Sequence, residues 1–149
     1  MIELDDIDKA IVRQLQVDGR MPYSQLAPLV GLSEAATRQR VNRLNERGVM
    51  SIVAVTDPIA LGYGYQAMLG IQVDAEAAVT AEKLSQIDEA EYVVVTTGRY
   101  DVLAELVCTD AEHLLDVIDS KIRNVSGVRN VETLTYLRIV KQSYDWGTM

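Results

Sequence analysis

The sequence predicts an α+β protein built of two domains, a small helical one followed by one that alternates strands and helices. Three observations predict it. The first 48 residues carry apolar positions at helical spacing, interrupted by two glycine-containing turns. From residue 65 onward, short runs of apolar residues typical of strands alternate with helical patterns. The formal net charge of −8 is also unevenly divided, with −1 in residues 1–57 and −7 in residues 58–149.

The first helix is predicted within residues 4–20. Its apolar residues recur every three or four positions, as on an amphipathic helix, at Leu4, Ile7, Ile11 and Leu15. Asp5 is a suitable N-cap, with Asp8 three residues further on, and Asp18-Gly19 ends the helix. A second, short helix is predicted within residues 22–31.

In the second helix, Leu26, Leu29 and Val30 are expected to be buried. Pro22 suits the first helical position. Pro28 is an anomaly, because a proline inside a helix removes a backbone donor at a cost of about 3 kcal/mol unless it lies near the first turn.

A third helix is predicted from residue 34 to 47, after the tight turn Gly31-Leu32. Ser33 is a good N-cap and Gly48 ends the helix. Its inner face carries Thr37, Val41 and Leu44, and its outer face carries Ala35, Arg38, Gln39, Asn42 and Arg43. Two helices joined by a glycine turn, the second exposing Arg, Gln and Asn, form the helix-turn-helix pattern.

Residues 38–47 are locally +3, which is compatible with phosphate binding in a domain that is nearly neutral overall. By charge pattern alone, such arginines are most often a solvated helix face. The preceding short helix and glycine turn favour DNA contact instead. Arg40 lies at the boundary between the two faces and could either touch a phosphate or brace the domain, and Arg47 is a charge at the helix end.

The second domain follows a predicted strand, VMSIVAVTD, and a turn-rich connector, DPIALGYG. Four further strands are predicted at YQAMLGIQV, YVVVTT, VLAELVC and VETLTYLRIV, with helices at TAEKLSQI and AEHLLDVIDSKI. This β-α-β-β-α-β order is the ferredoxin-like arrangement of a four-stranded antiparallel sheet with two helices on one face. The expected domains are residues 1–50 (helix-turn-helix), 51–63 (strand and linker) and 64–149 (ferredoxin-like).

The composition argues against several classes of function. The single cysteine, Cys108, excludes an intramolecular disulfide and is expected to be buried. The sole histidine, His113, has no neighbours at the spacing of a nucleophile or metal site, so we expect no catalysis, no cofactor and no metal. No apolar run is long enough to span a bilayer and the N-terminus is acidic, so we expect a cytoplasmic protein without membrane association.

Four fragments in this order and spacing resemble the Lrp/AsnC family, the leucine-responsive or feast/famine transcriptional regulators: LDDIDKAIVRQLQVDGR, LVGLSEAATRQRVNRLNERGV, TTGRYDVLAEL and TLTYLRIVKQS. The resemblance covers nearly the whole chain. It implies an N-terminal winged helix-turn-helix and a ferredoxin-like domain that senses small molecules, usually amino acids. It also implies assembly into homodimers and often octamers.

The resemblance implies particular site residues. The DNA-reading helix of the family matches Ser33 to Arg47, and we predict DNA contacts at Ser33, Ala35, Arg38, Gln39, Asn42 and Arg43. The effector loop of the family matches Gly98, Arg99, Tyr100 and Asp101. Arg99 stands where the family often has an acid, which favours a ligand carboxylate. Thr133 and Thr135 are expected to line the site from a neighbouring subunit. By turn chemistry alone, GRYD is a hairpin connection.

The predicted function is that of a sequence-specific DNA-binding transcriptional regulator that responds to a small molecule, most simply an amino acid. A two-fold dimer would read a palindromic operator with half-sites about one helical turn apart. The alternative is an amino-acid-sensing oligomer that acts through protein partners without specific DNA binding.

Overall fold

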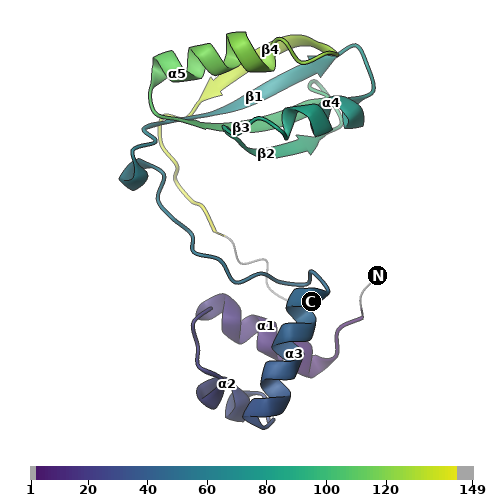
Figure 1. Ribbon diagram of the computed structural model, residues 1–149, viewed down its shortest axis with the longest axis vertical. Helices are drawn as coiled ribbons and strands as arrows, with labels where there is room; N and C mark the ends of the chain where they lie inside the picture. Colours follow the sequence, from purple (N-terminus) through teal and green to yellow (C-terminus); the bar gives the residue numbers. More distant parts are fainter. Residues whose placement is uncertain (1–2, 144–149) are drawn as a thin grey trace. The chain divides into compact units, whose positions relative to one another are not determined.

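The structure is a computed structural model that describes residues 3–143. The described residues divide into two compact units, one of residues 3–55 with 142–143 and one of residues 56–141 (Figure 1). The first unit contains three helices, and the second contains a four-stranded sheet with its helices. Among the described residues, no helix has the length and apolar character needed to cross a membrane.

Helix α1 (Asp6–Val17) begins and ends where the sequence predicts. The carboxylate of Asp5 accepts a hydrogen bond of 2.7 Å from the N–H of Asp8, so Asp5 is the N-cap. The predicted apolar stripe contributes to the core of the first unit through Leu4, Ile7, Ile11 and Leu15. The stripe also places Asp8 on the inner side of the helix, where it is buried.

Helix α2 (Tyr23–Leu29) is preceded by Pro22 as its N-cap, one position earlier than predicted. Pro28 lies in its last turn and lacks the N–H that would bond to the carbonyl of Ser24. The prediction that Leu29 is buried is wrong, because 59% of its surface is exposed. The buried face of this helix is instead formed by Leu26, Ala27 and Val30, and Leu29 lies about 100° from its centre.

Helix α3 (Glu34–Glu46) has the predicted N-cap, since the Ser33 hydroxyl accepts from the N–H of Ala36 at 3.3 Å. The inner residues predicted from its periodicity are all buried: Thr37, Val41 and Leu44. Gly48 follows the helix with φ of +67° and ends it. The N–H groups of Gly48 and Val49 bond back to the carbonyls of Asn45 and Leu44, which is the Schellman pattern.

The turn between α2 and α3 also depends on a glycine with positive φ and on a backbone hydrogen bond to the end of the preceding helix. Gly31 adopts φ of +70°, and the N–H of Leu32 bonds to the carbonyl of Ala27 at 3.0 Å. A side chain with a Cβ is strained in this conformation, so glycine suits the position. The predicted glycine turn of the helix-turn-helix is therefore confirmed.

The predicted strand VMSIVAVTD is wrong for this chain. Residues 50–56 are extended, but no backbone hydrogen bond joins them to another described residue. The β-branched composition that predicted a strand remains exposed, with Ile52 50% and Val53 71% accessible. A strand needs a neighbouring strand to satisfy its backbone, and the described part of the chain places none beside this segment. The connector after it contains a short 3₁₀ helix, η1 (Ile59–Leu61).

The second unit has the predicted β-α-β-β-α-β order. Its sheet consists of β1 (Tyr65–Val73), β2 (Ala90–Val95), β3 (Val102–Cys108) and β4 (Val128–Thr135). The strand order is β2-β3-β1-β4 and every neighbouring pair is antiparallel. This is the ferredoxin-like sheet, so the predicted fold class is confirmed.

The bounds of β1 and β3 match the prediction, whereas β4 runs over 128–135 and not over 131–140. The pairing partner explains where β4 ends. Thr135 pairs with Ala67 near the start of β1, and the N–H of Tyr136 makes a last bond to the carbonyl of Gln66. Since β1 begins at Tyr65, the apolar residues after Tyr136 have no further backbone of β1 to pair with.

Helices α4 (Ala77–Leu84) and α5 (Ala111–Asp116) cover one face of the sheet. α5 continues into a π-helical stretch, η2 (Val117–Ile122), in which the N–H of Arg123 bonds five residues back to Ile118. The core between sheet and helices is apolar and includes Leu69, Ile71, Leu84 and Val117. Cys108 is fully buried there, as predicted, and this burial raises the pKa of its thiol.

Candidate DNA-binding surface and effector loop

The outer face of α3 presents the side chains that the sequence predicts as DNA contacts. All of them are exposed on this face of the helix or at its cap: Ser33, Ala35, Arg38, Gln39, Asn42 and Arg43. Gln39 and Asn42 supply amide groups, and Arg38 and Arg43 supply guanidinium groups. These are the groups that form paired hydrogen bonds with base edges in the major groove.

Arg38 is positioned by an aromatic ring of the neighbouring helix. Its guanidinium carbon lies 5.4 Å from the ring centre of Tyr23, the first residue of α2. A cation at this distance from a ring is attracted to its face. Arg38 therefore remains exposed while its side chain is oriented by α2.

Arg40 and Arg43 are tied to the start of α1. Nη1 of Arg40 donates to Oδ2 of Asp5 at 2.6 Å and to Oδ1 of Asp8 at 2.8 Å. Nη2 of Arg43 donates to both carboxylate oxygens of Asp8, at 3.0 and 2.9 Å. The hydrogen bond from Arg40 is the main reason that the pKa of Asp5 lies below its ordinary value. Of the two roles that the sequence leaves open for Arg40, the structure shows bracing.

These ion pairs change the charge of the surface. The +3 of residues 38–47 is set against the carboxylates of Asp5 and Asp8, which leaves about +1. The outer face of α3 is therefore less basic than its sequence indicates. What this face offers to a ligand is mainly hydrogen-bonding groups, and only a small net positive charge.

The predicted effector loop connects β2 and β3, and backbone contacts hold it in shape. Gly98 adopts φ of +120°, a conformation that other residues rarely take. The hydroxyl of Thr96 donates to the carbonyl of Tyr100 at 2.7 Å, and the carboxylate of Asp101 accepts from the N–H of Val73 at 2.9 Å. Asp101 thus anchors the loop to β1, in keeping with the turn chemistry that the sequence allows.

Tyr100 extends from this loop across β1 to β4. Its ring lies against Gly70, where an added Cβ would come within 2.7 Å of ring carbons. Its hydroxyl donates to Glu132 at 2.5 Å, and this bond is the main cause that raises the pKa of Tyr100. Nη2 of Arg99 also donates to Glu132, at 3.1 Å. Two residues of the loop therefore converge on one carboxylate of β4.

A second tyrosine–glutamate pair lies on the same face of the sheet. Tyr136, just after β4, lies beside Glu105 of β3. Burial, followed by the neighbouring carboxylate of Glu105, raises the pKa of Tyr136 to about 12. This sheet face, which α4 and α5 do not cover, thus carries two tyrosine–glutamate pairs, whose glutamates lie on β4 and β3, the two neighbours of β1.

Thr133 and Thr135 are not brought to the loop within this chain. They pair with Leu69 and Ala67 of β1, whose side chains face the helices. Side chains alternate along a strand, so Glu132 points to the opposite face from both threonines. The loop residues and the two threonines therefore lie on different faces of the sheet.

Two domain families match this chain. Residues 4–45 match an AsnC-type helix-turn-helix domain, and residues 67–149 match a C-terminal dimeric alpha+beta barrel domain. The HTH-type transcriptional regulator FL11 of Pyrococcus furiosus is 35% identical over 144 residues, which cover 95% of this chain and 95% of that protein. This chain belongs to the Lrp/AsnC family of transcriptional regulators.

Solved structures of Lrp/AsnC proteins agree with this assignment. The leucine response regulatory protein LrpA of Mycobacterium tuberculosis is 30% identical, with a TM-score of 0.86 over 95% of this chain and 98% of that one. A feast or famine regulatory protein from M. tuberculosis, complexed with L-methionine, is 31% identical, with a TM-score of 0.84 over 94% of this chain and 96% of that one. These relatives are regulators and not enzymes, as the sequence predicts.

Sequence reasoning about this Lrp/AsnC protein missed Asp8, Gly70 and Glu132. Asp8 carried a readable signal, because it falls on the apolar stripe of α1, where an acid needs a partner. Gly70 interrupts an apolar strand, which indicates a close approach of another group. Glu132 had no such signal, since a glutamate on an edge strand is ordinary.

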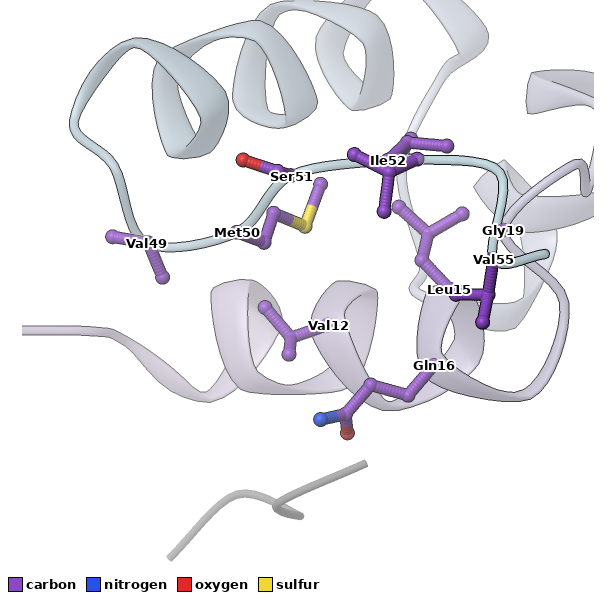
Figure 2. Close-up of a pocket in the computed structure, with 10 residues that line it drawn as sticks. Val12, Leu15, Gln16, Gly19, Val49, Met50, Ser51, Ile52 and Val55 are labelled. Carbon is purple, nitrogen blue, oxygen red and sulfur yellow. The ribbon is translucent and has the colours of Figure 1, made fainter. Parts of the chain in front are cut away.

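One hollow of the regulator lies in its first unit, with a volume of about 500 Å³. Figure 2 shows Val12, Leu15 and Gln16 of α1 on one side and Met50 and Ile52 of the extended segment on the other. Its lining is largely apolar, without a cluster of charged or nucleophilic groups. It is therefore unlike a polar ligand site.

His113 belongs to a structural cluster of the regulator. Its Nε2 lies 3.3 Å from Oε1 of Glu89, which also accepts from Lys121 at 2.7 Å. The bond from Lys121 is the main cause that lowers the pKa of Glu89. Within residues 3–143, no group of three histidine, cysteine or acidic side chains is arranged to hold a metal ion.

Proposed function

We propose that this Lrp/AsnC regulator binds double-stranded DNA through the outer face of α3 and recognises a palindromic operator as a homodimer. The observation that carries the proposal is the exposed row of guanidinium and amide groups on α3: Arg38, Gln39, Asn42 and Arg43. A two-fold dimer places two such helices in successive major grooves, so half-sites should lie about one helical turn apart.

Arg38→Ala tests this proposal, because Arg38 is exposed on the outer face of α3 and forms no salt bridge with a carboxylate of residues 3–143. Arg13→Ala, on the exposed side of α1, is a control with the same change of charge. The probe is the duplex that the wild-type protein enriches from a random-sequence library, measured at one stated salt concentration. We expect affinity to fall about tenfold or more for Arg38→Ala, the size of one lost base contact, and much less for Arg13→Ala.

Equal losses for the two variants would contradict base reading by α3. Thermal unfolding of both proteins controls for the lost contact between Arg38 and Tyr23. If the wild-type protein enriches no sequence at all, the alternative is favoured, in which the chain senses a small molecule and acts through protein partners.

The proposal includes an amino-acid effector at the loop of residues 98–101. The relative from M. tuberculosis that is complexed with L-methionine supports this class of ligand. The side chain of Arg99 is 74% exposed and its guanidinium can bind a carboxylate, but in the structure it pairs with Glu132. An effector carboxylate would therefore have to compete with Glu132 for Arg99.

A thermal-shift screen of the standard amino acids tests for the effector, because a ligand that binds the folded state raises the unfolding temperature. We expect Arg99→Gln to abolish the largest shift and Arg129→Gln, an exposed arginine of β4, to preserve it. A shift that survives in Arg99→Gln would place the ligand elsewhere.

Assembly into homodimers and larger oligomers completes the proposed function. The segment 50–56 has the composition of a strand but pairs with no described strand of its own chain, which supports association with a second copy. We propose that effector binding shifts the population between dimers and octamers in the cytoplasm, and so the number of DNA-reading heads that can bind together. Sedimentation with and without the amino acid found in the screen tests this; an unchanged distribution would contradict it.

A further inference from the structure

Asp8, in the first turn of α1, is a buried carboxylate of the first unit. Its side chain is 3% exposed, and both of its oxygens accept hydrogen bonds from α3. A buried carboxylate is costly unless it is paired, and Asp8 is paired with two arginines. The pairs join the first turn of α1 to the helix that carries the reading face.

The two arginines are restrained to different degrees. Arg43 places one nitrogen between both oxygens of Asp8, which fixes the direction of its guanidinium while 46% of the side chain stays exposed. Arg40 is shared between Asp8 and Asp5 and is 25% exposed. Arg43 is thus fixed by Asp8 on one side, while the rest of its side chain remains exposed to solvent.

We propose that Asp8 is a positioning residue for DNA recognition, which holds Arg43 in the reading orientation and keeps it from binding phosphates indiscriminately. This inference rests on the proposed DNA-binding function. It extends that function, because it assigns control of specificity to Asp8, a residue that lies outside the exposed face of α3.

The physical basis is the difference between phosphate and base contacts. A free arginine has a long, flexible side chain and can reach any nearby phosphate, which adds affinity for every sequence alike. A tethered guanidinium contacts DNA only where the groove brings an acceptor to it. Specificity is the difference between the affinity for the operator and the affinity for DNA of any other sequence. Restraint of Arg43 therefore raises specificity if it lowers the affinity for other sequences more than the affinity for the operator.

The test compares Asp8→Asn with Asp5→Asn. Both variants remove one negative charge at the start of α1, and asparagine at residue 5 still caps the helix. Only Asp8→Asn removes the charge that holds Arg43. The probes are poly(dI-dC) and the duplex that the wild-type protein enriches from a random library, each titrated at several salt concentrations.

We expect Asp8→Asn to bind poly(dI-dC) more tightly and with a steeper salt dependence, by about 1–2 in the log–log slope per DNA-reading unit, as one or two freed arginines reach phosphates. The ratio of specific to non-specific affinity should fall about tenfold or more, and Asp5→Asn should change it less than about threefold. Arg43→Gln added to Asp8→Asn should remove at least half of the added slope.

Arg43→Lys covers the case in which Asp8→Asn unfolds, which thermal unfolding would show. Arg43 gives only Nη2 to Asp8, which leaves the rest of its guanidinium for DNA. Lysine keeps the charge but has one nitrogen, which cannot hold Asp8 and read a base edge together, so the same loss of specificity is expected. Equal specificity ratios in the Asp8 and Asp5 variants, or in Arg43→Lys and the wild type, would overturn the proposal. Failure of the DNA-binding function itself looks different, since the wild-type protein would then enrich no duplex.

Discussion

The contact of Tyr100 with Gly70 predicts that β1 does not tolerate a side chain at residue 70. In Gly70→Ala, the new Cβ would lie 2.7 Å from ring carbons of Tyr100, closer than any stable contact. The ring must move away, and the movement breaks its hydrogen bond to Glu132. Overpacking costs about 1–3 kcal/mol, and the loss of a hydrogen bond to a charged group adds to this cost. We therefore expect a loss of at least about 2 kcal/mol in the free energy of unfolding.

Tyr100→Ala removes the obstacle and supplies the control. Without the ring, alanine at residue 70 should be neutral or stabilise the strand by about 0.5–1 kcal/mol, because glycine is unfavourable inside a strand. The four proteins of this double-mutant cycle are compared by urea unfolding at one fixed protein concentration, since association also shifts stability. A coupling energy of about 2–3 kcal/mol is expected, and additivity within about 0.5 kcal/mol would refute the proposed contact.

Two further predictions concern stability. The lowered pKa of Glu89 means that its ion pair with Lys121 stabilises the protein above the ordinary pKa of a glutamate and is lost as the pH falls through the lower, folded-state value. The free energy of unfolding of the wild type, measured in urea, should thus exceed that of Glu89→Gln by on the order of 1 kcal/mol at neutral pH. A difference that does not shrink as the pH falls below the ordinary pKa of a glutamate would contradict this. Pro28→Ala should stabilise the protein by about 1 kcal/mol, because it restores a donor for the carbonyl of Ser24, and a lower melting temperature would show that the proline is favourable.

The sequence was sufficient wherever a local pattern decides the structure. β1 and β3 were predicted at their observed bounds, since both are buried strands flanked by turn residues. The caps Asp5 and Ser33 were predicted because capping depends on residues three positions apart. The outer face of α3 was predicted from helical periodicity, and its side chains are exposed as expected.

The sequence-based predictions failed where a partner that is distant in the sequence determines the local structure or the contact. The segment 50–56 has strand composition, but no described strand lies alongside it. β4 ends where β1 runs out, which the apolar residues after Thr135 do not reveal. The partner of Arg43 lies 35 residues away at Asp8, and that of Tyr100 lies 32 residues away at Glu132. Such pairings depend on how the elements pack, which periodicity does not encode.

The single cysteine gives this protein a practical advantage for spectroscopy. Cys108 is enclosed in the core of the second unit, and its raised pKa keeps the thiol protonated at neutral pH. Because the thiolate is the form that reacts, a cysteine introduced at an exposed position such as Asn45 should be modified selectively, with the native residue left in place. A fluorophore or spin label attached there would report on the movement of α3 in the otherwise unaltered chain.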